Sequence, residues 1–515
     1  MSKTKILWAD DEIDLLKPHI LFLENKGYQV TKVVSGNEAL DEVKTENFDI
    51  VFLDENRPGM NGLDTLVQIK KIKKSLPVVM ITKSEEEYIM EEAIGGEISD
   101  YLIKPLNPNQ ILLSLKQILD DKRIVNEHST HAYQKEFREI AMQLGDRLDH
   151  DQWVDLYKKL VYWEMKLSTD GGNEMEEILE MQKKEANQQF AKYIERHYLD
   201  WVNQQDTAPL LSHQVFERVI FPRLGAQPVF VFVVDCLRFD QWKVFQSELS
   251  TYLRTESEDC YYSILPTTTQ YARNALFSGL LPSDIKKKFP KQWVDEEDEE
   301  SKNNYEAFFL EEALKRKGLN KKMKYDKIIT LDQAKRAVDH FHEYFEYDLV
   351  TIVYNFVDAL SHARTDTKII RELAEDEKAY RSLTRSWFVH SPFFEMLKRL
   401  ADKDAVVFIT TDHGSIRVDE ASQMVTDKNV NNNLRYKTGK TMQYQSKDVF
   451  EVQKPEEAKL PASQFNSKFI FAKENKFFAY RNNFNHYAKY YKDTFQHGGI
   501  SLEEVVVPLI ELKRK

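Results

Sequence analysis

The chain has 515 residues, 42% of them hydrophobic and 12% aromatic, so it is long enough for about three domains with packed cores. A formal net charge of −12 argues against a broad nucleic-acid-binding surface. The two cysteines, the absence of a basic-then-apolar leader, and the lack of any apolar run near the ~20 residues of a membrane span together favour a cytoplasmic protein in a reducing compartment.

Residues 1–121 alternate short apolar runs with amphipathic segments, which is typical of a doubly wound α/β domain. We expect a five-stranded parallel sheet in the order 2-1-3-4-5, in which function collects beyond the carboxyl ends of the strands. The five predicted strands are 5–9, 29–34, 48–54, 77–82 and 100–103.

Residues 122–225 hold few strand signals and many residues at helical spacing, such as the stripe of Leu156, Leu160 and Trp163. We predict a helical bundle linker here, with Gly171-Gly172 separating two helices. Residues 226–515 return to strand–helix alternation and are predicted to form a second α/β domain. The polar, Asn-rich segment 427–440 within it is predicted to be a loop.

Polar residues follow four of the strands predicted in the first domain. Asp10 and Asp11 follow strand 5–9, Asp54 ends the third strand, Thr82 ends the fourth, and Lys104 follows the fifth. Three converging carboxylates repel one another unless a cation joins them, and Mg²⁺ prefers such oxygen ligands. The sequence therefore predicts a site that binds a phosphoryl group on the central carboxylate.

These positions, within the motifs ADDE at 9–12, LDENRPGMNG at 53–62 and Lys104-Pro105, resemble the receiver domain of two-component response regulators. The resemblance implies that Asp54 accepts phosphate from a sensor histidine kinase. It also implies the roles of the surrounding residues: Mg²⁺ ligands Asp10 and Asp11, phosphoryl contacts Thr82 and Lys104, and switch aromatic Tyr101.

Three apolar runs of the last domain end in an aspartate, and histidines accompany these ends. The aspartates are Asp235, Asp358 and Asp412, and the histidines are His362, His413 and His497. Asp358 and His362 have helical i, i+4 spacing, so they share one face. Carboxylate and imidazole ligands suit Zn²⁺, and they also admit Mn²⁺ or Fe. The sequence therefore predicts a metal-dependent hydrolase.

Pro266 opens the segment PTTT, which precedes a helical pattern and carries three adjacent hydroxyls. A hydroxyl at this place could be a helix cap, or it could be a nucleophile whose pKa is lowered by a metal. The residues alone leave both roles open.

The ligand set and the segment PTTTQYARNALFSG at 266–279 resemble the alkaline phosphatase superfamily, and within it a PglZ-type domain at 226–515. The resemblance selects Thr269 as the nucleophile and divides the metal ligands into two groups. Asp358, His362 and His497 would hold one Zn²⁺, and the other would be held by Asp235, Asp412, His413 and Thr269.

The predicted mechanism is in-line displacement, in which Thr269 forms a phosphothreonine ester that water then cleaves, between two ions about 4 Å apart. Basic side chains would stabilise the phosphoryl oxygens; the candidates are Arg273, Arg435, Lys437 and Lys440, with Arg238 and Asn274 as weaker ones. The residues do not distinguish a monoester from a diester substrate. We expect Tyr261, Tyr262 and Tyr271 to pack in the core.

A receiver joined through a helical segment to a PglZ-type domain resembles the family of PorX-like response regulators over the full chain. That resemblance implies a zinc-dependent phosphodiesterase acting on linear or cyclic oligonucleotides. It also implies phosphorylation-dependent dimerisation and contact with the type IX secretion machinery.

Two other functions fit the same sequence. Segment 122–225 could contact DNA or a sigma factor, although the acidic balance counts against DNA. Alternatively, the chain could be a phosphorylation-switched binding module whose metals serve only its structure.

Overall fold

In the computed structural model the chain forms two compact units, Met1–Ala132 and Tyr133–Lys515. The residues that the structure describes are 4–54, 61–73, 75–82, 98–170, 173–204, 208–295, 301–367, 374, 376–426, 431–461 and 467–515. The predicted division into three domains stays a prediction, because α6 and α7 of the linker segment fall within the second unit.

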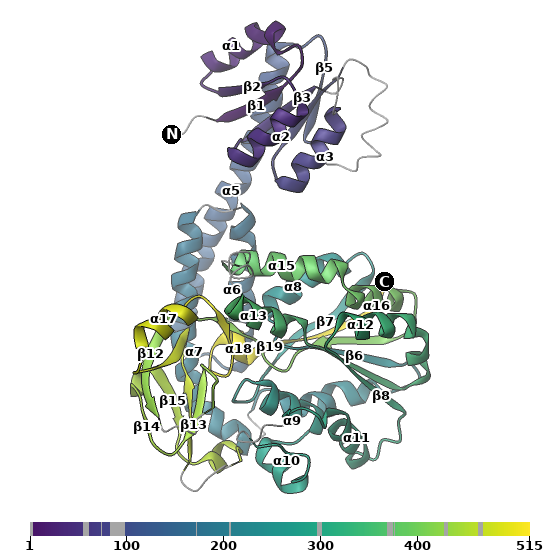
Figure 1. Cartoon of the computed structure of the whole chain (residues 1–515), viewed down its shortest axis with the longest axis vertical. Coiled ribbons are helices and arrows are strands. Elements are labelled where there is room, and N and C mark those ends of the chain that lie inside the picture. The colour runs from purple at the N-terminus through teal and green to yellow at the C-terminus, as the bar shows by residue number, and fades with distance from the viewer. Residues whose placement is uncertain are drawn as a thin grey trace. The chain divides into compact units, whose positions relative to one another are not determined.

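The N-terminal unit is built on a five-stranded parallel sheet in the order β2-β1-β3-β4-β5, which confirms the predicted topology (Figure 1). Each strand coincides with a run of apolar residues. The strands are β1 (Lys5–Ala9), β2 (Gln29–Val33), β3 (Ile50–Asp54), β4 (Val78–Thr82) and β5 (Asp100–Ile103).

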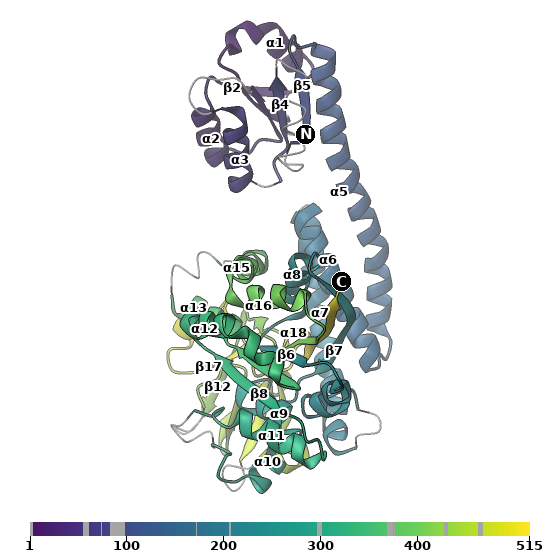
Figure 2. The ribbon, with the colours of Figure 1, turned by 90° about the vertical axis from the view of Figure 1, so that its right-hand side faces the viewer.

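Helices cover both faces of this sheet because successive strand residues point to opposite sides. Leu7 and Leu53 pack with residues of α2 (Gly36–Thr45) and α3 (Gly62–Ile72). On the other face, Trp8 and Phe52 pack with residues of η1 (Ile13–Leu16), α1 (Lys17–Asn25) and the start of α5 (Pro108–Gly145). Figure 2 shows the start of α5 on the opposite side of this sheet from α2 and α3.

Long helices open the C-terminal unit. The last part of α5 packs with α6 (His150–Asp170) and α7 (Asn173–Asn203) through aromatic contacts such as Tyr133–Trp163, whose ring centroids lie 5.3 Å apart. The predicted stripe on α6 is buried, as expected for the seam of a helical bundle. Gly171 and Gly172 lie outside the described residues.

A six-stranded mixed sheet forms the centre of the C-terminal unit, in the order β7-β19-β10-β6-β9-β8. Four neighbouring strands run parallel, and β19 is antiparallel to both β10 and β7. Its strands are β6 (Val229–Val234), β7 (Leu253–Tyr262), β8 (Met323–Ile328), β9 (Leu349–Tyr354), β10 (Val406–Thr410) and β19 (Val506–Arg514).

The connections between these strands are mostly helical and supply the layers around the sheet (Figure 1). The α-helices are α8 (Phe239–Leu249), α9 (Asn274–Ser278), α10 (Pro282–Lys288), α11 (Glu306–Arg316), α12 (Leu331–Asp339), α13 (Phe356–Asp366), α15 (Glu377–His390), α16 (Pro392–Ala401) and α18 (Leu502–Val505). Short 3-10 or π turns are η4 (Ser212–Gln214), η5 (Phe216–Ile220), η6 (Phe221–Arg223), η7 (Thr269–Arg273) and η8 (Phe341–Glu346).

The segment between β10 and β19 adds three small sheets. They pair β11 with β18, order β14-β12-β17, and order β13-β16-β15. The elements are β11 (Ile416–Arg417), β12 (Glu420–Thr426), β13 (Tyr436–Gly439), β14 (Met442–Gln443), η9 (Ser446–Asp448), β15 (Val449–Val452), η10 (Pro455–Ala458), β16 (Lys468–Ala472), β17 (Lys476–Tyr480), α17 (Phe484–Tyr491) and β18 (Phe495–Gln496).

One sequence prediction is wrong in this region. Tyr436–Gly439, expected to be part of a loop, forms β13 and pairs antiparallel with β16. The strand buries Lys437 because the amine donates to the Asn431 carbonyl and to the Tyr480 hydroxyl, which satisfies a polar group inside a sheet. Residues 427–430 of the predicted loop lie outside the described part.

The α/β fold class is confirmed for both units, with helices between them in sequence. Within the described residues, none of the helices combines the length and the apolar character that crossing a membrane requires.

Candidate functional site

The carboxyl edge of the N-terminal sheet gathers the predicted phosphoryl site. Asp54 ends β3, and Asp10 directly follows β1, its neighbour in the sheet. Lys104 Nζ lies 3.1 Å from Asp10 Oδ2 and 2.9 Å from Asp54 Oδ1. Asp10 and Asp54 are buried, whereas Asp11 is exposed, and the three carboxylates can approach one common ion.

Burial favours the neutral form of the Lys104 amine, but Asp54 and Asp10 outweigh it and raise the pKa of Lys104 above its ordinary value. The amine is therefore a fixed positive charge at the predicted acceptor. Thr82 ends β4 at the same edge and is buried. The side chain of Tyr101 and residues 55–60 of the predicted motif lie outside the described part of the chain.

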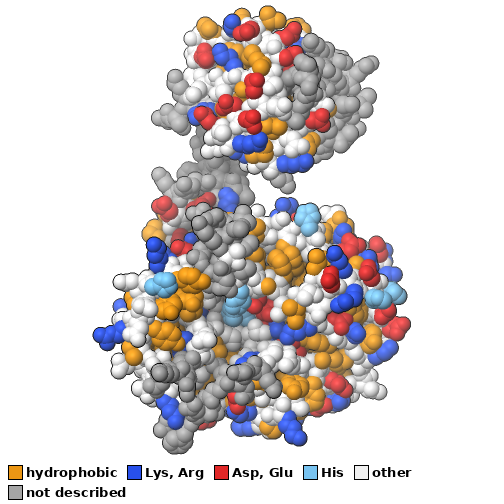
Figure 3. Space-filling view, in the orientation of Figure 1, with side chains coloured by type: hydrophobic (Ala, Val, Ile, Leu, Met, Phe, Trp, Pro, Cys, Tyr) orange, Lys and Arg blue, Asp and Glu red, His pale blue; other side chains and the backbone are white. Residues whose placement is uncertain are grey.

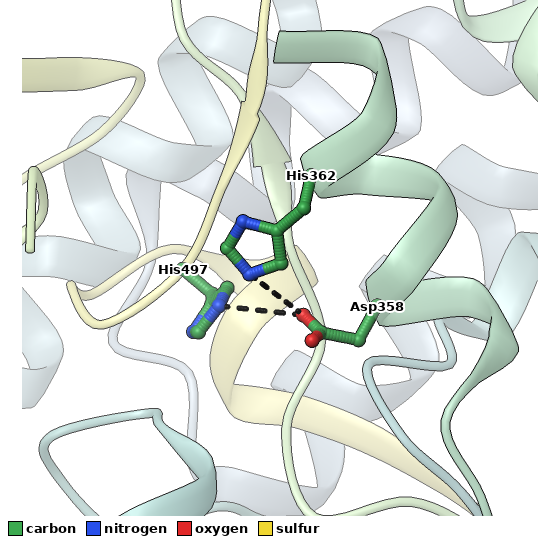
Figure 4. Close-up of side chains that lie close together, drawn as sticks. All are labelled: Asp358, His362 and His497. Atoms are coloured by element: carbon green, nitrogen blue, oxygen red, sulfur yellow. Dashed lines mark ion pairs between the residues drawn. The ribbon is translucent and has the colours of Figure 1, made fainter. Parts of the chain in front are cut away.

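At the carboxyl edge of the larger sheet, the first predicted metal group comes together from two segments. Asp358 and His362 lie one turn apart on α13, and His497 follows β18 (Figure 4). The Nε2 atoms of His362 and His497 lie 3.5 and 3.6 Å from the same oxygen, Asp358 Oδ1. His362 remains 63% exposed, so this group is open to a ligand from solvent.

The second predicted group lies beneath the surface. Asp235 directly follows β6, and Asp412 and His413 follow β10, the strand beside it. His413 Nε2 lies 3.7 Å from Asp235 Oδ1 and 3.7 Å from Asp412 Oδ2. After Asp235 the chain turns through Cys236 in the left-handed region (φ 65°), a conformation that side chains seldom adopt outside constrained sites.

The two groups are adjacent because the rings of His413 and His497 stack, with centroids 4.3 Å apart. His413 Nδ1 lies 3.1 Å from the Gly414 carbonyl, and His497 Nδ1 lies 3.2 Å from the Thr267 carbonyl. A carbonyl only accepts, so each Nδ1 carries the hydrogen and each Nε2 presents a lone pair. Figure 3 shows histidine and acidic side chains side by side near the centre of the C-terminal unit.

Three carboxylate oxygens in these groups are buried and have no hydrogen-bond partner among the described residues. They are Asp235 Oδ1, Asp358 Oδ1 and Asp412 Oδ2, the atoms that face the imidazole nitrogens. Separations of 3.5–3.7 Å are too long for hydrogen bonds. Two ligands of a tetrahedral zinc ion lie about 3.4 Å apart, so the donor set fits such ions.

The pKa values of these groups in the absence of a metal also indicate a site for cations. Burial and then the repulsion of Asp235 raise the pKa of Asp412 to about 8 and that of Asp358 to about 6. Burial, followed by the neighbouring His413, lowers the pKa of His497 to about 4. Buried carboxyl groups that resist ionisation beside neutral imidazoles lack the positive charge that bound cations would supply.

Arg273 holds Asp235 in place instead of facing solvent. Its guanidinium is 1% exposed, donates to Asp235 Oδ2 at 2.7 Å, and pairs with Glu306 Oε1 at 2.5 Å. Although burial opposes ionisation, Arg273 keeps the pKa of Asp235 below its ordinary value. Glu306 was not among the predicted site residues, because no sequence spacing links α11 to Arg273.

The three adjacent threonines differ in their surroundings. Thr267 is buried; its hydroxyl donates to the Gly499 carbonyl and accepts from the Gly498 N–H, each at 3.0 Å. The Thr268 hydroxyl is buried and has no partner within the described ranges. Thr269 is half-buried, and its Oγ1 lies 3.3 Å from His413 Nε2. Only Thr269 has its hydroxyl at the ligands.

Most of the other predicted phosphate contacts form ion pairs or hydrogen bonds within the protein. Arg435 is fully buried, pairs with Glu504 Oε2 at 2.6 Å, and donates to backbone carbonyls that include Glu474 O. Lys437 is buried in β13, and Arg238 pairs with two carboxylates. Asn274 donates to the Gln270 carbonyl. Lys440 alone of the four main candidates is exposed.

The sequence matches three known family models in chain order. Residues 6–116 match the response regulator receiver domain, and residues 123–202 match the PorX response regulator linker domain. Residues 215–512, more than half of the chain, match the BREX system PglZ alkaline phosphatase-like domain. The chain belongs to the PglZ alkaline phosphatase-like family. The three matches confirm the predicted PorX-like fusion of a receiver to a PglZ-type domain, and both domain types imply bound metal ions.

Curated relatives include two regulatory proteins that each match less than a quarter of this chain. The transcriptional regulatory protein ResD of Bacillus subtilis is 31% identical over 118 residues, 23% of this chain and 49% of that protein. The regulatory protein PhoP of the same organism is 33% identical over 117 residues, 22% of this chain and 48% of that protein. The chain thus spans about half the length of these relatives. Among solved structures, the chemotaxis protein CheY4 of Vibrio cholerae is 29% identical and covers 23% of this chain and 99% of its own, with a TM-score of 0.21.

A Gly414→Ala change is expected to disturb the metal groups through the backbone. A Cβ at Gly414 would lie 1.9 Å from the Glu503 carbonyl oxygen, so the segment after His413 would have to shift. We expect a loss of stability of ~1–3 kcal/mol and weaker metal binding. Thermal unfolding measures the stability, and competition with a chelator measures the metal affinity. Gly145→Ala is the control, because its Cβ meets nothing within 4 Å; equal behaviour of the variants would contradict the expectation.

Proposed function

We propose that this chain is a cytoplasmic response regulator whose output unit is a zinc-dependent phosphodiesterase that cleaves linear or cyclic oligonucleotides. Phosphorylation of Asp54 by a sensor histidine kinase, with Mg²⁺ at Asp10 and Asp11, would control it. A role in type IX secretion, through the secretion machinery or a sigma factor, comes from the PorX-like resemblance and is part of the proposal.

One observation carries the enzymatic part. Three buried carboxylate oxygens without hydrogen-bond partners in the described part of the chain face imidazole lone pairs in two adjacent groups, and a half-buried hydroxyl lies beside them. A purely structural zinc site is closed by four protein ligands, whereas a catalytic one keeps an open position. The group of Asp358, His362 and His497 offers three protein ligands and an exposed histidine, which supports catalysis.

Thr269 is the proposed nucleophile. Its Oγ1 would form a bond to phosphorus as the bond to the leaving alkoxide breaks in line, and water would then cleave the phosphothreonine ester. Two bound zinc ions would lower the pKa of the hydroxyl and of the water and balance charge on the phosphoryl oxygens. Thr269 is held from behind, since Asn303 donates to its carbonyl oxygen at 2.9 Å.

Other residues of the chain would keep the ligands oriented. Arg273 fixes one oxygen of Asp235 and leaves the second free. The Thr267 hydroxyl ties down the backbone beside His497, and the Thr267 carbonyl holds the ring of His497. We propose these positioning roles for Arg273 and Arg435 in place of direct phosphate contact, because carboxylates already neutralise both guanidinium groups.

This neutralisation supports a diester substrate. A phosphate monoester carries up to two negative charges and requires more positive charge than a diester, which carries one. The buried arginines near the site are paired with Asp235, Glu306 and Glu504, so they offer no uncompensated charge. Exposed Lys440 remains the proposed phosphate contact among the basic candidates.

Thr269→Val removes the proposed nucleophile while it keeps the side-chain shape. We expect hydrolysis of bis(p-nitrophenyl) phosphate by the zinc-loaded protein to fall at least ~1,000-fold, with the fold and most of the metal retained. Thr268→Val is the matched control, because that hydroxyl has no partner in the described structure, and it should retain activity within ~3-fold. Equal turnover by the two variants would show that Thr269 is not the nucleophile.

The receiver site predicts a single phosphate on Asp54. Incubation with acetyl phosphate and Mg²⁺ should add one phosphate to the intact mass, and Asp54→Ala should abolish the addition. Asp49→Ala is a suitable control, since Asp49 is also an aspartate of the β3 segment but accepts from the Lys5 backbone N–H at 2.8 Å. A wild-type protein without an adduct would exclude this receiver chemistry.

Phosphorylation is proposed to cause dimerisation through the receiver. Beryllofluoride, which mimics the aspartyl phosphate, should shift the sedimentation coefficient from a monomer to a dimer in wild type and leave Asp54→Ala unchanged. A protein that stays monomeric at ~50 μM with beryllofluoride would contradict the proposal, since a physiological dimer with a Kd near 1 μM would be almost fully formed.

A further inference from the structure

Seven charged side chains, four of them buried and three half-buried, form a network between the linker helices and the output core. Two come from the linker, Glu164 on α6 and Lys183 on α7. The other five come from the start of α8, from α15 and from α18; they are Arg238, Asp240, Glu377, Arg381 and Glu503. Burial of so many charges is costly unless each is paired and hydrogen-bonded. The partners of each charge therefore identify the segments that the network holds together.

The linker contributes through short contacts. Lys183 Nζ lies 2.7 Å from Glu164 Oε2, and the other Glu164 oxygen accepts from Arg381 of α15. Asn187 on α7 donates to Glu503 Oε2 at 3.0 Å, and its own oxygen accepts from the Leu502 N–H at 2.8 Å. Two linker helices therefore share polar contacts with α15 and α18.

The output core completes the network. Arg238 donates to both oxygens of Asp240, at 2.6 and 2.9 Å, and to Glu377 Oε2 at 2.5 Å. Arg381 connects the linker residue Glu164 to the output core, because its Nη1 also lies 3.2 Å from Asp240 Oδ2. Burial opposes ionisation of Asp240, but the two guanidinium groups outweigh it and lower the pKa of Asp240.

The carboxylates of this network are not a further metal site. Glu164, Asp240 and Glu377 have oxygens close enough to share an ion. Each of them, however, already accepts from Arg238 or Arg381, which occupy the space between the carboxylates. Seven groups with four negative and three positive charges are close to balance, so the network does not require a cation.

The network lies directly behind the proposed metal groups. Arg238 is three residues after the ligand Asp235 and precedes α8. Gly414, next to the ligand His413, is packed so closely that an added Cβ would meet the Glu503 carbonyl oxygen and would lie 3.6 Å from Arg238 Cγ. Gly414 also donates to the Glu504 carbonyl oxygen at 3.1 Å. The Arg238 guanidinium lies over Phe495, two residues before His497, at 5.0 Å.

We propose that Glu164 and Lys183 of the linker are positioning residues for the metal site. Through Arg381, Arg238 and Glu503 they fix the backbone segments that carry Asp235, His413 and His497. The linker helices are then a structural part of the output site, and a displacement of α6 or α7 would change metal affinity without touching a ligand. The inference rests on the proposed function, because it assigns regulation to the same site.

Glu164→Gln tests the proposal in the full-length protein. The change keeps the shape but removes the charge that pairs with Lys183 and Arg381, so both cations would draw the network into a new arrangement. The zinc Kd, from competition with a chromophoric chelator, should rise ~10-fold, the lower end of the effect of losing a direct partner of a metal ligand, because Glu164 acts through Arg381 and Arg238. With saturating zinc, kcat on bis(p-nitrophenyl) phosphate should fall at least ~10-fold with KM within ~3-fold.

The matched control is Glu136→Gln, the same substitution in a second linker ion pair. Glu136 of α5 lies with its Oε1 3.0 Å from Lys159 Nζ of α6, and among the described residues neither forms an ion pair with the output core. This variant should keep wild-type zinc affinity. Lys183→Arg conserves the charge and should keep zinc affinity within ~3-fold of wild type. General destabilisation by substitutions in the network would instead lower zinc affinity in this variant as well.

Asn187→Ala keeps all seven charges and provides a second measurement if Glu164→Gln fails to fold. It should raise the zinc Kd ~10-fold, since it removes the only described side-chain hydrogen bond from α7 to Glu503. Wild-type zinc affinity in a folded Glu164→Gln, or in Asn187→Ala, overturns the proposal. The zinc measurements need no substrate: a wild type that binds zinc but cleaves no phosphodiester refutes the proposed function and leaves the positioning test intact.

Discussion

The repulsion among carboxylates at the carboxyl ends of parallel strands in two sheets is the constraint on which both units depend. In each, neighbouring strands end in aspartates that the topology brings together: Asp10 with Asp54, and Asp235 with Asp412. This proximity follows from the parallel strands, because their carboxyl ends meet at one edge of the sheet. Folding of such an edge requires positive charge, and the source of that charge determines the chemistry.

The two units satisfy this requirement differently. In the N-terminal unit, Lys104 contacts both carboxylates with a single amine on a flexible stem, which suits the proposed reversible phosphorylation. In the C-terminal unit, Arg273 holds Asp235 through a rigid guanidinium that is itself anchored by Glu306. A fixed guanidinium keeps one oxygen of Asp235 occupied and the other directed at His413, which suits a permanent metal site better than a reversible phosphorylation.

The sequence predicted those parts of the structure that depend on strand ends and short motifs. Apolar runs identified the strands, and Asp or His after them identified groups that the fold does bring together. It did not predict which partner neutralises each charge. Arg273, Arg435 and Arg238 were candidates for phosphate binding, yet they pair with Glu306, Glu504 and Glu377, carboxylates whose proximity depends on tertiary packing. For the same reason β13 was predicted as a loop, since the partners that allow Lys437 to be buried are not adjacent in sequence.

The network of Glu164, Lys183 and the output arginines gives the linker a thermodynamic connection to the metal site. Arg381 and Glu164 are 217 residues apart, yet loss of either takes an ion-pair partner from the other, and inside the protein that costs more than the loss of a surface ion pair. Any signal that changes the position of α6 or α7 therefore changes the free energy of the segments that hold Asp235 and His413. Linkage requires the converse as well: metal binding must favour one arrangement of the linker helices, because a coupling free energy acts equally in both directions. Metal occupancy and the arrangement of α6 and α7 are then coupled in one equilibrium. A receiver that favours one arrangement of these helices would change metal affinity.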